Sequence, residues 1–411
     1  MNVLFIVPYV PNLVRTRPYN LIRHLSARGN RVTVLTVWAN EQEQAELAHL
    51  QEICDEVHAA PMPLWHSLLN SVLALPNRKK PLQSVYSWKP ELANQLNGAA
   101  SSFDVVHVEH LRGSRYGLHF KTNSTLPVVW DSVDCITHLF RQAATQSKSL
   151  KGRFRSWLDL ERTAHYEGWL LDKFNHVLVT SPVDREALLG LTPAGSVPAP
   201  ISVVGNGVDV EHFSPDPSVK REPATLVISG KMSYHANVTM TLHLVNEIMP
   251  HVWQQRPEAK LMIVGKDPTR EIQALADHPN IEVTGTVPAL PPYLQRATVA
   301  VAPITYGAGI QNKILEAMSC GTPMVTTPHA VSALCIEPGR DLLVADDSES
   351  YAQAILSILD SPEKQEVLGR NGRTYVEQYH HWPNVAGRLE TIYAEAIATS
   401  MPQSSRTLGK Q

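Results

Sequence analysis

The segment from Pro303 to Thr327, PITYGAGIQNKILEAMSCGTPMVTT, combines residue types that could bind a phosphate and a ribose. It reads as a Gly-rich loop, a short helix, a glycine turn and an apolar strand. Residues 308–311 would lie at the start of the helix, where free backbone N–H groups and the helix dipole favour an anion. Lys313 adds a full positive charge, and Glu316 shares its face of the helix. This pattern suits a nucleotide, although a Gly loop and a Lys/Glu pair also occur in α/β proteins as a turn and a surface ion pair.

Other candidates follow apolar runs elsewhere in the chain. Gly230 and Lys231 come directly after ATLVIS, and a lysine on such a turn could neutralise a pyrophosphate without a metal. Glu109 and His110 follow DVVHV and could contact an acceptor or carry a proton. The alternative at Lys231 is a solvated lysine, and His107 within the strand is as readily a core histidine as a ligand.

The N-terminal half carries a further set of charged candidates. Arg15 and Arg17 lie at a predicted helix start, where two guanidinium groups could bind an anion, unless both are solvated surface arginines. Arg112 follows the DVVHVEH motif, and Asp131 follows LPVVW. Asp131 and Asp134 do not form a D-x-D motif, and the chain contains none. The sequence therefore predicts no metal site, and the lysines would supply the positive charge.

The composition limits the class of protein. At 411 residues, two domains of roughly 200 residues are the default, and the 43% of apolar residues can fill two cores. A net charge of −3 argues against a nucleic-acid partner. The four cysteines lack zinc-ligand spacing, and no apolar run approaches the roughly 20 residues that cross a bilayer. The start MNVLFIVPYVP lacks basic residues and reads as a buried strand. We expect a cytoplasmic protein, with the inner face of the membrane as an alternative place.

Short apolar runs alternate with amphipathic stretches through both halves of the chain. In the first half they are NVLFIVPY, RVTVLTV, DVVHVEH, LPVVWDS, HVLVTS and PISVVGNG, and later they are ATLVISG, KLMIVG, IEVTG, VAVAP and TPMVTT. Continuous Val/Ile/Leu strands separated by helices predict parallel sheets covered on both faces. The two series predict an α/β protein with two doubly wound, Rossmann-like domains that face an interdomain cleft.

The domain boundaries follow from breaks in this rhythm. Asn-Gly, two prolines and several charges interrupt it after Gly205. The predicted divisions are an N-terminal acceptor-binding domain over 1–205, a junction over 206–222, a nucleotide-binding domain over 223–380, a closing helix over 381–398 that packs back on the N-terminal domain, and a disordered tail over 399–411.

Two stretches mix apolar and basic residues. Leu64–Lys80, LWHSLLNSVLALPNRKK, ends in three cations, and Lys148–Trp157, KSLKGRFRSW, interleaves cations with aromatic residues. Either could rest on an anionic membrane. The more common arrangement turns the apolar face inward and leaves the cations in water.

Taken together, these motifs resemble the family 4 (group 1) glycosyltransferases, which have the GT-B fold. GIQNKILEAMSCG is similar to the family's Gly loop followed by L-E-A-M-A-x-G, and VVGNGVDVEHFSP to its P-N-G-V-D-x-x-x-F-x-P. VISGKMSYHANV, KLMIVG and DVVHVEH resemble further family motifs, so the resemblance covers nearly the whole chain. The variant GIQNKILEAM is similar to sugar transferases of bacterial exopolysaccharide clusters, which suggests polysaccharide biosynthesis.

The resemblance implies a retaining, metal-independent hexosyltransferase that uses a UDP- or GDP-linked sugar and no cofactor. Glu316 would bind the ribose, and Lys231 stands where the family has its phosphate-binding Arg. The predicted donor-binding residues are Gly230, Lys231, Val287, Gly309, Ile310, Gln311, Lys313 and Glu316. The predicted catalytic residues are Glu109, His110, Lys231 and Lys313, and the acceptor side, expected to suit an anionic acceptor, has Arg15, Arg17, Arg112 and Asp131.

This sequence also departs from the family pattern. Ala308 stands in place of the first Glu of the family's Glu, seven residues, Glu pattern. The phosphate-binding Lys is Asn237, and the second His of H-x-H is Glu109. Lys313 lies where the family usually has Pro or a small residue, and we expect it to replace the charge lost at Asn237.

Three other functions stay open on the sequence alone. A nucleotide-sugar epimerase or a phosphorylase would keep the fold and change the reaction. A dinucleotide-dependent oxidoreductase is disfavoured, because no strand is followed by G-x-G-x-x-G with an acidic residue about 20 positions later. A non-catalytic nucleotide- or sugar-binding protein is the third, suggested by Ala308.

Overall fold

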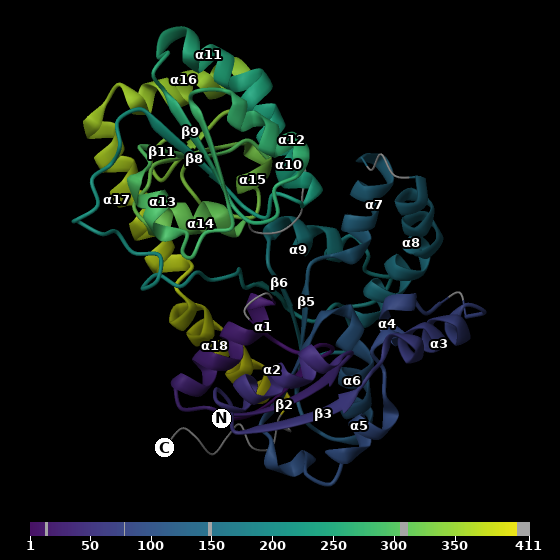
Figure 1. Ribbon diagram of the computed structural model, residues 1–411. Coiled ribbons are helices and arrows are strands. Elements are labelled where there is room, and N and C mark those ends of the chain that lie inside the picture. Colours follow the sequence, from purple (N-terminus) through teal and green to yellow (C-terminus); the bar gives the residue numbers. More distant parts are fainter. Residues whose placement is uncertain (13–14, 78, 147–149, 305–310, 401–411) are drawn as a thin grey trace. The chain divides into compact units, whose positions relative to one another are not determined.

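The chain folds into two units, one of which is made from two separate segments. The computed structural model describes residues 1–411 except 13–14, 78, 147–149, 305–310 and 401–411, and over 143–158 it describes the backbone alone. Unit 1 comprises Met1–Gly205 together with the chain from Val385 onward, and unit 2 comprises Asn206–Asn384. Each unit is an α/β fold built around one parallel sheet (Figure 1).

Unit 1 contains a parallel sheet with strand order β3-β2-β1-β4-β5-β6-β7. The strands are β1 (Asn2–Val7), β2 (Arg31–Trp38), β3 (Glu56–Pro61), β4 (Val105–Glu109), β5 (Val128–Val133), β6 (His176–Val179) and β7 (Ile201–Val203). In the central register Val3 pairs with Val32 on one side and Val105 on the other. The order reverses between β1 and β4, and the carboxyl ends of strands at such a reversal are where doubly wound sheets bind ligands.

Helices connect these strands and leave the sheet covered. They are α1 (Thr16–Ala27), α2 (Glu41–Gln51), α3 (Leu64–Ala74), α4 (Leu82–Tyr86), α5 (Pro90–Gln95), the 3₁₀ turn η1 (Ala100–Ser102), α6 (His110–Asn123), α7 (Ile136–Gln146), α8 (Leu150–Leu170), α9 (Pro182–Leu189) and α18 (Trp382–Ser400). Because both faces of the sheet are covered, β4 is buried along its whole length, including the polar His107 and Glu109. Trp130 on β5 is also completely buried.

Unit 2 repeats the plan with strand order β10-β9-β8-β11-β12-β13. The strands are β8 (Thr225–Ser229), β9 (Lys260–Val264), β10 (Ile281–Gly285), β11 (Val299–Ala302), β12 (Met324–Thr326) and β13 (Leu343–Val344). The helices are α10 (His235–His243), the π-helical η2 (Leu244–Ile248), α11 (Met249–Gln255), α12 (Arg270–Ala274), the 3₁₀ turn η3 (Leu275–Asp277), α13 (Pro291–Arg296), α14 (Asn312–Ser319), α15 (Pro328–Val331), α16 (Ser348–Leu359) and α17 (Pro362–Tyr379). Here the order reverses between β8 and β11.

The prediction of two doubly wound, Rossmann-like domains is confirmed. The sequence reading missed β3 and β13. EVHAAP on β3 has a single β-branched residue, and β13 has only two residues, so neither gives the continuous Val/Ile/Leu run that marks the other strands. The predicted tail also needs correction, because α18 continues through Thr399 to Ser400; residues 401–411 lie outside the described part of the chain.

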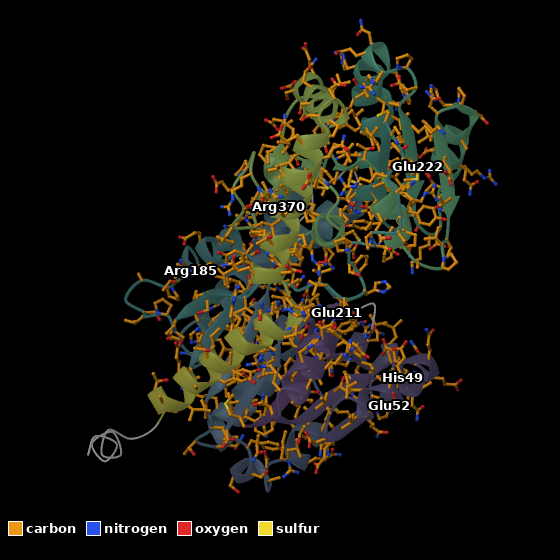
Figure 2. The ribbon with its side chains drawn as sticks, turned by 90° about the vertical axis from the view of Figure 1, so that its left-hand side faces the viewer. His49, Glu52, Arg185, Glu211, Glu222 and Arg370 are labelled. Atoms are coloured by element: carbon orange, nitrogen blue, oxygen red, sulfur yellow. The ribbon has the colours of Figure 1, made fainter. Side chains whose placement is uncertain are left out.

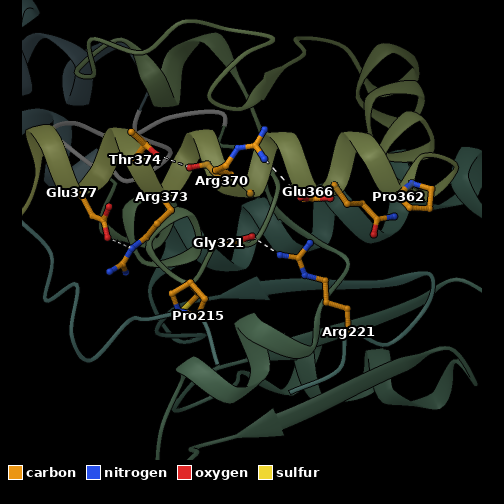
Figure 3. A pocket seen from close by; sticks show the side chains of 12 residues that line it. Pro215, Arg221, Gly321, Pro362, Glu366, Arg370, Arg373, Thr374 and Glu377 are labelled. Atoms are coloured by element: carbon orange, nitrogen blue, oxygen red, sulfur yellow. Dashed lines mark hydrogen bonds and ion pairs between the residues drawn. The ribbon is translucent and has the colours of Figure 1, made fainter. Parts of the chain in front are cut away.

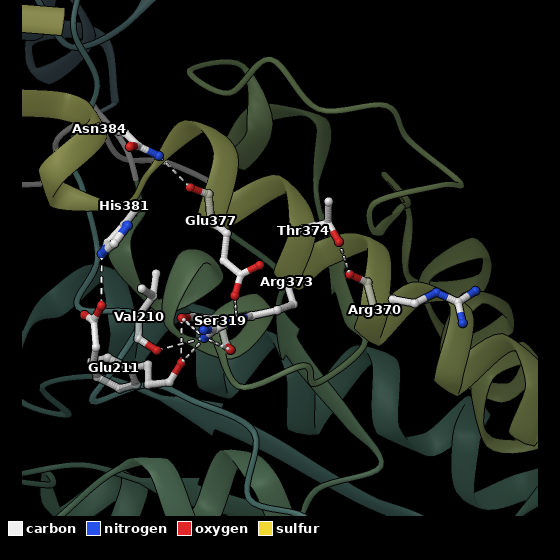
Figure 4. A network of polar contacts seen from close by, with 10 residues as sticks. Val210, Glu211, Ser319, Arg370, Arg373, Thr374, Glu377, His381 and Asn384 are labelled. Carbon is white, nitrogen blue, oxygen red and sulfur yellow. Dashed lines mark hydrogen bonds and ion pairs between the residues drawn. The ribbon is translucent and has the colours of Figure 1, made fainter. Parts of the chain in front are cut away.

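The segment predicted as a junction, 206–222, belongs to unit 2 and is fastened there by Arg373 of α17 (Figure 4). Nη1 of Arg373 donates hydrogen bonds to the carbonyl oxygens of Val210, Phe213 and Ser319 at 2.9, 2.7 and 2.6 Å. Its Nε donates to Glu377 at 2.7 Å. One guanidinium thus satisfies three backbone carbonyls that regular structure does not use. The segment around Val210 and Phe213 is therefore held by unit 2 and is not a free linker.

Several charged side chains lie on the outside of the two units (Figure 2). His49, Glu52, Arg185 and Arg370, labelled there, are all exposed. His49 and Glu52 form a pair across one turn of α2, with 3.7 Å between Nδ1 and Oε2. Such exposed pairs contribute little to stability. Burial of the apolar strands contributes most of the stability of each unit.

Candidate functional site

In unit 2, the loops that follow β8 and β9 approach each other through two glycines. Gly230 and Gly265 have φ of +150° and +152°, and a Cβ on Gly265 would lie 1.7 Å from the carbonyl oxygen of Gly230. Only glycine fits so close an approach. A Cβ on Gly230 would lie 2.6 Å from Nδ2 of Asn237, at the start of α10. The first turn after β8 is therefore packed against α10, at the sheet edge where the strand order reverses.

The central contact of this edge joins α14 to α10. Nζ of Lys313 donates to Oδ1 of Asn237 at 2.6 Å, and Nδ2 of Asn237 donates to the carbonyl oxygen of Lys231 at 3.0 Å. Asn237 therefore links the loop after β8 to the helix after β11. Three positions that the sequence analysis singled out separately meet at this point.

Glu316 lies one turn further along α14. Burial raises the pKa of Glu316 to about 7, and the nearby Lys313 ammonium opposes this shift. Burial lowers the pKa of Lys313 to about 8, and the Glu316 carboxylate opposes that shift. At neutral pH Lys313 is mostly charged, whereas Glu316 is divided between its two forms. Because Glu316 is only partly ionised, it does not fully neutralise Lys313. An anion close to Lys313 would therefore be attracted by its positive charge.

Lys231 itself is more open. Its Nζ lies 3.8 Å from Oδ2 of Asp267, and both side chains are more than half exposed. The sequence analysis did not single out Asp267, although it follows β9 closely and the carboxyl-end criterion applies to it. Val287, two residues beyond β10, is half-buried against the core. Lys231 is thus accessible to a ligand from solvent.

The start of α14 is only partly described. Gln311 is the N-cap residue, and α14 begins at Asn312. Gly309 and Ile310, predicted to offer backbone N–H groups, and Ala308 lie outside the described residues. Oδ1 of Asn312 is buried without a hydrogen-bond partner among the described residues. The sequence analysis missed this amide, which adds an unsatisfied acceptor beside Lys313.

In unit 1, Glu109 ends β4 and is completely buried. Its Oε1 accepts a hydrogen bond from the hydroxyl of Tyr9 at 2.7 Å, and its Oε2 has no partner among the described residues. Burial first, and then the charge of Asp131, raise the pKa of Glu109 to about 8. At neutral pH Glu109 is therefore mostly protonated. It can donate a hydrogen bond, but it is a poor proton acceptor.

The two histidines on either side of Glu109 differ in surroundings. His107 is fully buried, stacks on Phe5 at 4.0 Å and is hydrogen-bonded through Nδ1 to the hydroxyl of Tyr393 at 2.9 Å. The structure thus places His107 in the core, the alternative left open by the sequence. His110 begins α6 with φ of +63°. Burial lowers the pKa of both imidazoles to about 4, so both are neutral at pH 7.

The arginines predicted to bind an anion at the start of α1 have carboxylate partners within unit 1. Arg17 donates from Nε and Nη2 to Oδ2 of Asp131 at 3.0 and 2.7 Å, and the pair is almost fully buried. Arg15 is half-exposed, donates to Glu43 at 2.9 Å and lies 4.7 Å from the ring centre of Tyr9. Arg17 and Asp131 are thus buried and paired with each other, and their contact with an acceptor stays a prediction. Arg15 keeps an accessible face.

A pocket of about 160 Å³ opens next to these residues within unit 1. Tyr9, Arg15 and Arg112 line it, together with Leu64 and Ser67 of α3. The guanidinium of Arg112 lies 4.9 Å from the ring centre of Tyr86, another lining residue. Glu109 reaches the pocket wall through its hydrogen bond to Tyr9. Arg15 and Arg112 thus line the same pocket, and Glu109 contacts it through Tyr9. Arg17 and Asp131 are buried and do not line it.

A larger pocket of about 570 Å³ lies in unit 2 beside α17 (Figure 3). Its arginines are already paired: Arg221 donates to the carbonyl oxygen of Gly321, and Arg373 to Glu377. Arg370 lies 3.7 Å from Glu366. The pocket adjoins Gly321, just beyond the C-terminal end of α14, whereas Lys313 lies in the first turn of α14. The pocket and the contact of Lys313 with Asn237 are therefore at opposite ends of this helix.

Two family models match the chain, one in each half. Residues 14–207 match a glycosyl transferase 4-like domain, and residues 223–361 match the glycosyl transferases group 1 model. The chain belongs to the group 1 glycosyltransferases. This confirms the family resemblance drawn from the motifs.

The curated relatives of this group 1 glycosyltransferase are distant in sequence. A human phosphatidylinositol N-acetylglucosaminyltransferase chain is 25% identical over 251 residues, which are 56% of this chain and 48% of the relative. The chain spans about half the length of this protein and of its similar fission-yeast counterpart.

Solved structures share the fold of this chain. Sucrose-phosphate synthase from Thermosynechococcus elongatus has a TM-score of 0.66 at 17% identity, over 97% of this chain and all of the other. HepE from Anabaena, in complex with UDP and glucose, has a TM-score of 0.65 at 14% identity, over 96% of this chain and 99% of the other. The predicted GT-B fold is thereby confirmed.

Proposed function

We propose that the chain transfers a sugar from a nucleoside diphosphate sugar, UDP- or GDP-linked, to an acceptor hydroxyl, with retention at the anomeric carbon and without a metal. The observation that carries the donor assignment is the contact of Lys313 with Asn237, because Asn237 links the ammonium of Lys313 to the backbone of Lys231 after β8. Family membership and the UDP found in the HepE structures support the choice of donor.

The proposed role of unit 2 is to stabilise the leaving diphosphate. In the proposed step the bond between the anomeric carbon and the diphosphate oxygen breaks, and the acceptor oxygen forms the new bond on the same face. The acceptor proton passes to the departing phosphate oxygen. Lys231 and Lys313 would offset the charge that develops there, in a position set before the reaction begins. Glu316 would accept hydrogen bonds from the ribose hydroxyls.

The acceptor would bind in the unit 1 pocket lined by Tyr9, Arg15 and Arg112. Two guanidinium groups at this pocket support an anionic acceptor. Glu109, mostly protonated at neutral pH, accepts a hydrogen bond from the hydroxyl of Tyr9, and would hold that hydroxyl beside the acceptor without acting as a base. Nδ1 of His110 accepts from the backbone N–H of Arg112 at 3.3 Å, so in the neutral ring Nε2 carries the proton and would donate a hydrogen bond.

A thermal-shift screen of UDP, GDP, ADP and their sugars tests the donor assignment. A ligand that binds only the folded state at 100 times its Kd adds about 2.7 kcal/mol of stability. We expect one nucleotide to raise the Tm of the wild type, and Lys231→Ala and Lys313→Ala to weaken that rise. The matched control is Lys260→Ala, because Lys260 is exposed at the opposite end of the same sheet, where β9 begins.

Product analysis with the selected donor separates the rival functions. Transfer of the sugar to an added acceptor supports the proposal. Phosphate-dependent release of sugar 1-phosphate would indicate a phosphorylase, and a changed sugar without an acceptor would indicate an epimerase. Binding without any turnover of any donor would indicate a non-catalytic protein.

A further inference from the structure

Helix α3 packs inward through small and polar residues. Ser67 and Ala74 are buried, and Nδ2 of Asn70 donates to the carbonyl oxygens of Val85 and Trp88 at 3.1 and 3.0 Å. This is the reverse of a surface helix of a soluble protein, whose apolar stripe faces the core. The apolar side chains of α3 and the residue after it point the other way.

The large apolar side chains of this segment are between 43% and 70% exposed. They are Leu64, Trp65, Leu68, Leu69, Val72, Leu73 and Leu75. Half of the large apolar side chains exposed in the described part of the chain lie in these twelve positions. Singly exposed apolar residues are ordinary, but a contiguous apolar face of this kind marks a surface that binds something.

The stretch of chain that contains α3 lacks acidic residues. No Asp or Glu occurs from Val57 to Pro90, although the whole chain has 39 in 411 residues. Lys79 and Lys80 follow the apolar face directly and are exposed. An apolar face that is followed along the chain by exposed lysines complements an anionic, oily partner.

We propose that α3 lies in the head-group region of an anionic phospholipid bilayer, with Trp65 and its apolar neighbours inserted and with Lys79 and Lys80 against lipid phosphates. The helix has 11 residues, about 16 Å, so it lies in the plane of the interface and does not cross it. Among the described helices, none is long and apolar enough to span a membrane.

The width of the apolar face favours a bilayer over a second copy of the chain. At about 100° per residue the exposed side chains cover about half of the helix circumference, which exceeds the minimum stripe of about 100° through which a helix packs on a protein neighbour. A bilayer surface covers the wider face without matching its shape. Trp65 also has the side chain that interfaces favour, an amphipathic ring.

The docking helix also borders the unit 1 pocket, because Leu64 and Ser67 line it. Docking would therefore hold the mouth of this pocket at the level of the lipid head groups. An acceptor anchored in the bilayer could then present its polar end to Arg15 and Arg112. This last step rests on the proposed function, whereas the docking of α3 does not.

Co-sedimentation of the full chain with lipid vesicles tests the docking, without donor or acceptor present. We expect binding to phosphatidylcholine vesicles that contain phosphatidylglycerol, and binding at least about tenfold weaker to phosphatidylcholine alone or at high salt. Trp65→Ser with Val72→Ser should abolish binding, and Lys79→Gln with Lys80→Gln should remove its dependence on phosphatidylglycerol. These side chains are exposed, so the Tm should not change.

Two control variants and one spectroscopic signal sharpen the result. Val183→Ser removes an apolar side chain exposed on α9, and Lys260→Gln removes an exposed cation of unit 2; both should bind like the wild type. Brominated acyl chains should quench the tryptophan fluorescence of the wild type, and Trp65→Phe should lose most of that quenching.

Three outcomes would overturn the proposal. The first is that the wild type does not bind the vesicles, and the second is that Trp65→Ser with Val72→Ser binds them as well as the wild type does. The third is a dimer in solution that Trp65→Ser with Val72→Ser converts to a monomer, which would assign the face to a second copy. Loss of nucleotide binding in the separate thermal-shift assay would count against the proposed function and leave the docking result intact.

Discussion

The ammonium of Lys313 lies 2.6 Å from Oδ1 of Asn237, although the two residues are 76 positions apart. The family resemblance implies a phosphate-binding lysine at position 237 and a small residue at position 313. In this chain the ammonium of Lys313, on the other helix, contacts the side chain at position 237, and we propose that it replaces the missing charge. The contact supports an exchange of side chains between α10 and α14 that keeps the charge.

Lys313→Ala should lower kcat/KM for the nucleotide sugar by about 10²–10³, the usual effect of removing one preorganised charge from a leaving group. If the charge has only moved, Asn237→Lys in the Lys313→Ala background should restore most of the activity. Steady-state kinetics of the single and double variants measure this. Lys260→Ala is the matched control and should behave like the wild type. A double variant as inactive as Lys313→Ala alone would refute the exchange.

Nucleotide binding should weaken as the pH rises through about 8. The pKa of Lys313 is lowered to about 8 by burial, so the lysine loses its charge there, and a bound diphosphate favours the charged form. Titration calorimetry between roughly pH 7 and pH 9 should show that Kd rises once the pH exceeds the pKa of Lys313 in the free protein. Lys313→Arg keeps its charge throughout and should lose this dependence. An equal rise in Kd for both proteins would contradict the assignment.

Gly230→Ala should disturb the donor side specifically. The new Cβ would lie 2.6 Å from Nδ2 of Asn237, at a backbone φ of +150°, and we expect a loss of about 1–3 kcal/mol in stability together with a raised donor KM. Gly29→Ala is the matched control, since its φ is +88° and its Cβ would meet nothing within 4 Å. Denaturation and kinetics on both variants separate backbone strain from displacement of Asn237. A normal donor KM in Gly230→Ala would argue that Asn237 does not position the cation.

Glu109→Gln should become more stable relative to the wild type as the pH rises from about 4.5 to about 8. Burial raises the pKa of Glu109 to about 8, above its ordinary value, so between these limits the folded state holds a proton that the unfolded state has lost. The wild type therefore loses up to about 1.4 kcal/mol per pH unit from this group, and the variant does not. Urea denaturation at several pH values gives the difference. A difference independent of pH would show that Glu109 titrates normally.

Arg17→Met should destabilise unit 1 by about 3–5 kcal/mol, because it leaves the buried Asp131 carboxylate without its cation. Replacing both, as Arg17→Met with Asp131→Leu, should restore part of the loss, since no charge then stays buried alone. Chemical denaturation of the two single variants and the double variant tests this as a cycle. Additive losses would mean that the pair is not coupled.

The sequence predicted the architecture well because most of its strands have a distinctive composition. Runs such as NVLFIV and TLVIS are apolar throughout, and a strand covered on both faces needs that composition. The short edge strand β13 and the Ala-containing β3 lack this signal. Helix α17 begins at Pro362, and proline in the first turn is a typical signal of a helix start.

The site was predictable in its residue types and less so in its pairings. Lys231, Lys313 and Glu316 follow strands in the sequence, so their shared edge could be deduced. Nothing in the sequence alone indicates that Arg17 pairs with Asp131, because partners 114 positions apart meet only once the strand order is known. Nor does it show that the apolar face of α3 points outward, since an amphipathic pattern has no direction of its own.

Helix α18 imposes a condition on any recombination between relatives. It begins in unit 2, and from Val385 it belongs to unit 1, where Tyr393 meets His107 and Glu390 binds Arg28 at 2.8 Å. A chimaera spliced once at Gly205 would therefore give unit 1 a foreign final helix. Exchange of donor preference between family members needs two crossovers, one at each end of Asn206–Asn384. Recombination that changes donor preference would therefore exchange an internal segment and leave the C-terminal helix in place.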